Sequence, residues 1–184
     1  MLSNQTSACA NRRSAMKFFI PLLCLLLTGG PLSLAATAAA DLRGTTEGSK
    51  ISGKVELEET SEGLKIKAIV SKAPPGKHGF HIHESGSCAD GGKAAGGHFN
   101  PENVPHGLLA RDGFSGAHAG DLGNIEINAD GDGQLETFLS GLSLSQGKYN
   151  VAEKAVILHA KEDDFGQPAG NAGDRIGCGV ITKN

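Results

Sequence analysis

The sequence predicts an all-β fold in the form of an antiparallel sandwich or barrel. Three observations indicate this class. After residue 41, short segments alternate apolar and polar residues, which is the period of a strand with one buried face. Turn residues separate the segments, as at 129–133 and 145–148, and no long helical periodicity appears. Roughly seven or eight short strands with Gly-rich connections are typical of sandwiches and barrels.

The alternation locates the strands in order. Residues 54–58 and 64–70 both alternate, and Ser61-Glu62-Gly63 between them predicts a hairpin loop. The remaining strands are expected at 79–83, 123–129, 134–138, 155–159 and 179–182.

Two long Gly-rich stretches, 85–120 and 161–177, interrupt this rhythm. Connections longer than about 12–15 residues in a compact domain are usually functional or disordered. The residues able to support chemistry lie in these two stretches or at their edges. We therefore expect both to be functional loops.

The first 40 residues predict a secretory signal peptide. They contain no acid, and their basic residues precede an apolar run at 18–27 and a small-residue tract at 35–40. A basic start, a short apolar stretch and an Ala-rich exit are typical of such a peptide. We expect cleavage near 38–40, which leaves a domain at 41–184.

This N-terminal segment predicts an exported protein, located in the periplasm or the extracellular space. The alternative is a membrane anchor. The apolar run is well short of the roughly 20 residues that a bilayer-spanning helix needs. Stable membrane insertion is therefore not expected.

Removal of the signal peptide would leave two cysteines, Cys88 and Cys178. In an exported protein, such a pair most simply forms a disulfide. From residue 41 on, 14 Lys and Arg oppose 20 Asp and Glu, which gives a net charge of −6. This charge argues against nucleic acid as a partner.

The seven histidines all follow residue 41. His81 and His83 share one face of a predicted strand, a geometry that suits two metal ligands or two solvated side chains equally well. Further ligand-type residues favour the metal: they are His98, His106, His118, Asp121 and His159. Imidazoles without thiolates suit copper or zinc, and a carboxylate favours zinc. The number of ligands is sufficient for two ions.

Four motifs give the chain a family resemblance. They are Gly79-Phe80-His81-Ile82-His83-Glu84, Gly96-Gly97-His98-Phe99-Asn100-Pro101, His118-Ala119-Gly120-Asp121-Leu122-Gly123-Asn124 and Gly170-Asn171-Ala172-Gly173-Asp174-Arg175-Ile176-Gly177-Cys178-Gly179-Val180-Ile181. In this order they resemble copper–zinc superoxide dismutase, and with the signal peptide the exported bacterial type. The resemblance implies an eight-stranded antiparallel Greek-key β-sandwich or barrel, immunoglobulin-like, with two long functional loops.

The resemblance also implies a ligand for each metal position. Copper would be held by His81, His83, His98 and His159. Zinc would be held by His98, His106, His118 and Asp121. His98 would thus bridge both ions, while His78 matches a structural position and not a ligand.

Three further roles follow from the same resemblance. Asp163 would link a copper histidine to a zinc histidine, the alternative being a solvated loop acid. Cys88 and Cys178 match the family's disulfide. Arg175 matches the arginine that attracts superoxide, the alternative being a surface ion pair with Asp174 or Asp164.

The implied activity converts two superoxide anions to dioxygen and hydrogen peroxide, with Arg175 and His98 as catalytic residues. A copper-binding or copper-delivery domain and a non-catalytic, zinc-stabilised sandwich are the alternatives. Because the net charge repels an anion, a local positive field is needed, and Lys161, Lys93 and Arg111 are candidates beside Arg175.

The connection at 107–117 contains apolar residues that predict either a local core, which we favour, or a subunit contact. The sequence leaves the oligomeric state open between a monomer and a homodimer.

Overall fold

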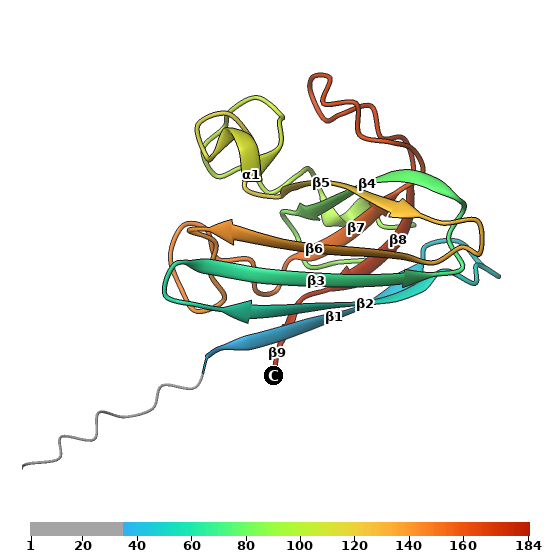
Figure 1. The fold of residues 1–184 in the computed structure, drawn as a ribbon, viewed down its shortest axis with the longest axis horizontal. Coiled ribbons are helices and arrows are strands. Elements are labelled where there is room, and N and C mark those ends of the chain that lie inside the picture. Colours follow the sequence, from blue (N-terminus) through green and yellow to red (C-terminus); the bar gives the residue numbers. More distant parts are fainter. Residues whose placement is uncertain (1–34) are drawn as a thin grey trace, which may run out of the picture. The chain divides into compact units, whose positions relative to one another are not determined.

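The computed structural model describes residues 35–184. This part of the chain contains nine antiparallel strands (Figure 1). In order they are β1 (Thr37–Gly44), β2 (Ser52–Glu59), β3 (Gly63–Ser71), β4 (Gly76–His83), β5 (Asp121–Ile127), β6 (Gly133–Ser140), β7 (Ala155–His159), β8 (Arg175–Val180) and β9 (Thr182–Lys183). The predicted all-β class is confirmed.

Eight of these strands close into a barrel. Their order is β2-β3-β6-β5-β4-β7-β8-β1, and β1 pairs back with β2, while β9 adds to β1. The barrel has two weak seams, because β5 and β6 share the pair Ile127–Gly133 alone and β1 meets β8 only at Arg43 and Gly44. Since β3 pairs with β6 and not with β4, the connections cross between the halves, as in a Greek key.

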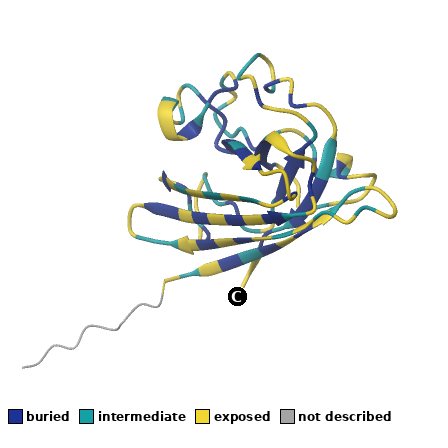
Figure 2. Cartoon of the chain, turned by 45° about the vertical axis from the view of Figure 1, so that its right-hand side comes forward, coloured by how far each residue is buried: buried dark blue, intermediate teal, exposed yellow. Residues whose placement is uncertain are grey.

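The core lies inside the barrel and follows the alternation seen in the sequence. On β3, Leu64 and Ile66 are buried, whereas Lys65 and Lys67 are exposed. This alternation appears as stripes of buried and exposed residues along the strands (Figure 2). Each fully buried aliphatic side chain of this kind stabilises the fold by about 1.5–3 kcal/mol, so the apolar faces fix the register of the sheet.

The first strand, β1, is not predicted by the sequence. Its Ala38 and Ala40 are buried and lie opposite Leu57 and Val55 of β2. The predicted cleavage region, 38–40, therefore falls inside β1. Most of the predicted signal peptide lies outside the described residues.

Both long predicted loops pack against β4. The β4–β5 loop (84–120) returns to this strand through a bridge between His98 and His83. The β7–β8 loop (160–174) reaches it where the Gly79 N–H donates to the Lys161 carbonyl. The predicted disulfide between Cys88 and Cys178 is confirmed, and it ties the β4–β5 loop to β8. The two loops therefore lie beside the strand that carries His81 and His83.

The apolar residues at 107–117 extend the main core and do not form the separate local core that the sequence predicts, because Leu109 belongs to the main core and Phe114 packs against it. This connection contains the short helix α1 (Leu109–Asp112), whose Leu109 is buried. Phe114 stacks on Tyr149, with ring centroids 3.7 Å apart and 10° between the ring planes. The other helical segment is η1 (Lys93–Ala95). Within residues 35–184, no helix combines the length and apolar character that crossing a membrane requires.

Candidate metal centre

Six histidines and an aspartate gather into two groups that share His98. The ligand atoms within each group lie within 4.8 Å of one another. The first group is His81, His83, His98 and His159, and the second is His98, His106, His118 and Asp121. The structure thus brings together every ligand position that the sequence predicts for copper and for zinc.

Strand β4 explains how the first group forms. Phe80 and Ile82 face the barrel core, so His81 and His83 project from the opposite face. The two loops cover that face and leave His81 and His83 only 0% and 1% exposed. This burial excludes the reading of two solvated histidines. His159, at the end of the neighbouring β7, completes the group from the adjacent strand.

Hydrogen bonds to carbonyl groups fix the tautomers of two histidines in this group. His83 Nδ1 donates to the Gly96 carbonyl at 3.0 Å, and His159 Nδ1 donates to the Gly173 carbonyl at 3.2 Å. A neutral imidazole carries one proton, so the Nε2 atoms of both rings present lone pairs. These two atoms lie 3.3 Å apart. Two facing lone pairs fit a cation between them.

The second group is arranged around the buried carboxylate of Asp121. One oxygen, Oδ1, lies 2.8 Å from His98 Nδ1 and 3.2 Å from His118 Nδ1. The other, Oδ2, accepts the backbone N–H groups of Gly107 and His118. His106 Nδ1 lies 2.9 Å from Oδ2 yet is a buried nitrogen without a hydrogen-bond partner. The four ligand atoms lie within 4.8 Å of one another, and this set of three imidazoles and a carboxylate fits a bound cation.

Burial and charge set the pKa values of these imidazoles. Burial lowers the pKa of His83 to about 2, that of His159 to about 3 and that of His98 to about 4. Burial also acts to lower the pKa of His106, but the nearby carboxylates of Asp121 and Asp163 outweigh it and raise that pKa to about 9. The first three rings are therefore neutral near pH 7, as metal ligands must be. The negative charge around His106 favours a cation, whether a proton or a metal.

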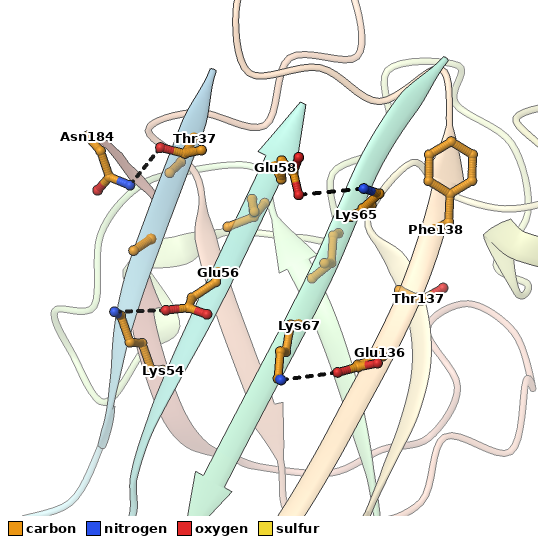
Figure 3. A pocket seen from close by; sticks show the side chains of 14 residues that line it. Thr37, Lys54, Glu56, Glu58, Lys65, Lys67, Glu136, Thr137, Phe138 and Asn184 are labelled. Carbon is orange, nitrogen blue, oxygen red and sulfur yellow. Dashed lines mark hydrogen bonds and ion pairs between the residues drawn. The ribbon is translucent and has the colours of Figure 1, made fainter. Parts of the chain in front are cut away.

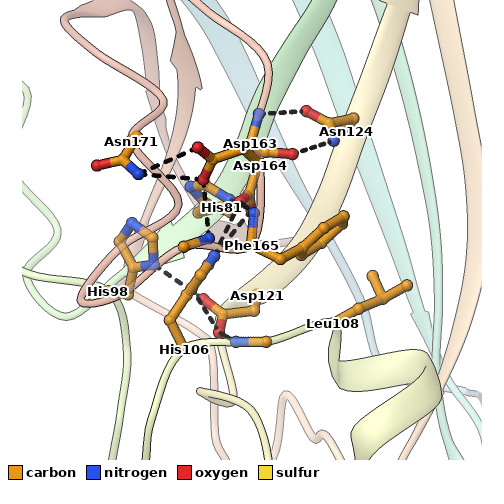
Figure 4. A network of polar contacts seen from close by, with 12 residues as sticks. His81, His98, His106, Leu108, Asp121, Asn124, Asp163, Asp164, Phe165 and Asn171 are labelled. Atoms are coloured by element: carbon orange, nitrogen blue, oxygen red, sulfur yellow. Dashed lines mark hydrogen bonds and ion pairs between the residues drawn. The ribbon is translucent and has the colours of Figure 1, made fainter.

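Asp163 lies between the two groups and is buried, with 1% of its surface exposed. Its Oδ2 accepts the His81 Nε2 proton at 2.8 Å, and its Oδ1 accepts the His106 Nε2 proton at 2.9 Å (Figure 4). Burial acts to raise the pKa of this carboxyl, but the hydrogen bonds from His106 and His81 hold it well below its usual range. The bond to His81 leaves Nδ1 of that ring as a buried lone pair without a partner. The structure therefore does not support the alternative of a solvated loop acid.

Arg175 begins β8 and is held by backbone carbonyls of the β4–β5 loop. Nη1 donates to the Gly92 carbonyl and Nη2 to the Gly96 carbonyl, both at 2.6 Å. Partial burial lowers the pKa of the guanidinium from its ordinary value, but the group still carries its positive charge near pH 7. None of the ion pairs within residues 35–184 involves Arg175. The alternative of an ion pair with Asp174 or Asp164 is therefore not observed.

Comparison with known proteins identifies the family. A family model described as copper/zinc superoxide dismutase (SODC) matches residues 51–181. The chain belongs to the copper/zinc superoxide dismutase family. The predicted family, its copper and zinc cofactors and its oxidoreductase class are thereby confirmed.

Relatives of this chain carry names that agree with this family. The chain is 40% identical over 168 residues to "Superoxide dismutase [Cu-Zn] 2" of Aquifex aeolicus (strain VF5), covering 85% of this chain and 96% of that protein. It is 41% identical over 140 residues to "Extracellular superoxide dismutase [Cu-Zn]" of Caenorhabditis elegans, covering 72% of this chain but 62% of that protein. A solved structure, "Crystal Structure Analysis of the clock protein EA4", superposes with a TM-score of 0.72 at 32% identity and covers 83% of this chain and 98% of that one.

His78 lies outside both ligand groups in this superoxide dismutase family member, as the sequence analysis expects. Its Nδ1 faces the His159 carbonyl and its Nε2 faces the Pro74 carbonyl, each at 2.8 Å. The ring therefore fixes the backbone of His159 from the buried side.

Two residues that support the superoxide dismutase site were not singled out from the sequence. Asn124 exchanges two hydrogen bonds with the backbone of Asp163, of 2.7 and 2.9 Å. Glu84 accepts the Gly97 N–H at 2.9 Å, directly before His98. Both lie within the quoted family motifs, but a polar residue beside a ligand carries no pattern that shows what it binds.

Gly170 is required where the β7–β8 loop crosses Asp163. Its φ is 74°, and a Cβ there would lie 1.9 Å from Asp163 Oδ1 and 2.7 Å from His106 Nε2. Glycine adopts this conformation without strain, and it alone has no Cβ to fill that space.

A hollow of about 830 Å³ lies away from the metal groups, on the outer face of β1, β2, β3 and β6 (Figure 3). Its charged side chains are paired: Lys54 with Glu56 along β2, and Lys65 with Glu58 and Lys67 with Glu136 between neighbouring strands. The hollow thus offers no set of convergent unpaired groups, and we assign it no part in catalysis.

We expect Asp163→Asn to weaken binding of both metals by about 10–100-fold, because an amide cannot accept protons from two imidazoles at once. Competition with a chelator measures the affinity of the variant for each ion. Asp164→Asn, at the exposed neighbouring acid, is the matched control and should bind as the natural chain does. Unchanged affinities in Asp163→Asn would contradict the linking role.

Proposed function

We propose that the chain is an exported superoxide dismutase with one copper and one zinc site. Copper is held by His81, His83, His98 and His159, and zinc by His98, His106, His118 and Asp121. The observation that carries this assignment is the pair of Nε2 lone pairs of His83 and His159, 3.3 Å apart, with both Nδ1 protons committed to carbonyls. Lone pairs brought this close in a buried site repel each other without a cation.

When bound, copper supplies the alternate acceptance and return of one electron, and zinc supplies a fixed positive charge. The chain's own residues provide the rest of the chemistry. One superoxide anion loses an electron and leaves as dioxygen, while a second gains it and takes up two protons to leave as hydrogen peroxide. His98 Nδ1 faces Asp121, so its Nε2 is the atom that can hold and deliver a proton on the copper side.

Arg175 attracts and orients the superoxide anion. The carbonyls of Gly92 and Gly96 fix its guanidinium, whose remaining N–H donors are left for the substrate. Of the other steering candidates, Arg111 is paired with Asp112 at 2.7 Å, whereas Lys93 and Lys161 are exposed. We therefore assign the local positive field to Arg175 with support from Lys93 and Lys161.

The metal content and activity of the mature protein test this function. We expect one copper and one zinc per chain together with rapid disproportionation of superoxide, measured by elemental analysis and a superoxide assay on the same sample. Copper without activity would support a copper-delivery domain. Zinc alone, without activity, would support a structural sandwich.

We expect Arg175→Ala to lower the rate constant for superoxide about tenfold or more, because the local field that draws in an anion is lost. Metal content should not change, and the rate should become less sensitive to salt. Arg43→Ala removes the same charge from an exposed position on β1 and should leave the rate nearly unchanged. A rate and salt dependence in Arg175→Ala equal to those of the natural chain would exclude the assignment.

Export to the periplasm or the extracellular space is part of this proposal. It is supported by the N-terminal pattern, by the disulfide, and by relatives in Caenorhabditis elegans and Haemonchus contortus that are named extracellular. The alternatives of a monomer and a homodimer are distinguished by sedimentation of the mature chain.

We propose that signal-peptide cleavage precedes Thr37, because Ala38 and Ala40 are buried within β1. Mass spectrometry of the exported protein should give a mature chain that begins at or before Thr37. A mature chain beginning at Asp41, after the initially expected cleavage region, would contradict this position.

A further inference from the structure

The segment that carries His106 has no regular secondary structure of its own. Residues 103–108 lie between a turn and α1. Within residues 35–184, the backbone of His106 takes part in no backbone–backbone hydrogen bond outside strands and helices. Something else must therefore hold this ligand in place.

Gln167 supplies both missing partners from the β7–β8 loop. The His106 N–H donates to Gln167 Oε1 at 3.0 Å, and Gln167 Nε2 donates to the His106 carbonyl at 2.9 Å. A carboxamide carries one acceptor and donors in one plane, so it satisfies both backbone groups of a single residue. This contact joins residues that are 61 positions apart in the chain.

Neighbours of Gln167 contact the ring of the same histidine. Asp163 binds the His106 Nε2 edge, and Phe165 stacks on the ring with centroids 6.4 Å apart and 18° between the planes (Figure 4). Arg111 lies over the Phe165 ring, with its Cζ 5.5 Å from the ring centroid. Residues 163–167 thus hold His106 by its edge, its face and its backbone.

A second carboxamide in the same region acts only locally. Asn100 exchanges hydrogen bonds of 2.9 and 3.2 Å with the backbone of Val104, and so closes a turn within the β4–β5 loop. That turn shapes the segment but does not connect it to Asp163. Gln167 makes this connection, so the backbone of His106 and the carboxylate that orients its ring move together.

We propose that Gln167 is a positioning residue for the zinc site, which fixes the backbone of His106 so that Nδ1 points at the centre shared with Asp121. This inference rests on the proposed assignment of zinc to His98, His106, His118 and Asp121. The role is specific: the two hydrogen bonds, and not the bulk of the side chain, restrict where Nδ1 lies.

The test compares two variants that lack both hydrogen bonds. Gln167→Met keeps the volume of the side chain, whereas Gln167→Ala loses the volume as well. Mature protein loaded with copper and zinc is challenged with a chromogenic chelator, and zinc affinity and release are measured. Both variants should bind zinc about tenfold more weakly. Copper affinity should change less, because the Gln167 side chain hydrogen-bonds to His106, which is not a member of the copper group. Gln134→Met, at an exposed position on β6, should match the natural chain.

Cobalt(II) placed in the zinc site provides a second measurement, because its visible spectrum reports ligand geometry. We expect altered band positions and intensities in Gln167→Met and unchanged unfolding of the metal-free protein by denaturant. If Gln167→Met had the zinc affinity and cobalt spectrum of the unsubstituted chain, the proposal would be overturned. A loss of zinc affinity in Gln167→Ala alone would also overturn it. A natural chain that binds no zinc would instead overturn the zinc assignment itself, and the positioning role with it.

Discussion

The placement of protons on buried imidazoles is the constraint on which the site depends. Backbone carbonyls accept hydrogen bonds from Nδ1 of His83 and His159, and Asp163 accepts hydrogen bonds from Nε2 of His81 and His106. For His81, His83 and His159 this contact leaves the other ring nitrogen as a lone pair turned toward the centre of a group. At His106 the neighbouring carboxylates raise the pKa to about 9, so a metal ion there would displace a proton. A set of lone pairs assembled in this way is costly in a dry interior, unless a cation stabilises it. Metal binding therefore depends on hydrogen bonds made by the ring nitrogens that face away from the metal.

The barrel tolerates this set of buried lone pairs because the residues that stabilise the fold are not the residues that form the metal site. The interior is filled by alternating apolar residues such as Leu64 and Ile66. His81 and His83 lie on the outer face of β4, where the two loops cover them, and the disulfide ties one of these loops to β8. Loop residues can therefore change partners without leaving a cavity in the core, which is where large losses of stability arise.

The strands were predictable wherever apolar and polar residues alternate, as in β2 and β3. Strand β1 was not, because its alanines read equally well as the exit of a signal peptide. β8 begins at Arg175, earlier than predicted, since its Gly-rich start has no alternation. The grouping of the ligands followed from family resemblance and not from spacing, because residues far apart in the chain meet only after folding. Gln167 could not be found at all, since an amide in a Gly- and Pro-rich loop gives no signal.

The carbonyl of Gly96 accepts hydrogen bonds from both His83 Nδ1 and Arg175 Nη2. A Cβ at this residue would lie 2.4 Å from Glu84 Oε1, and its φ is 76°, so the position is closed to other amino acids. One peptide group thus couples the geometry of His83, a proposed copper ligand, to that of Arg175, the residue proposed to attract superoxide. For protein engineering, the positions of these two side chains are not independent variables: a redesign of the loop around Gly96 moves His83 and Arg175 together, whereas the paired charges on the outer sheet contact neither residue.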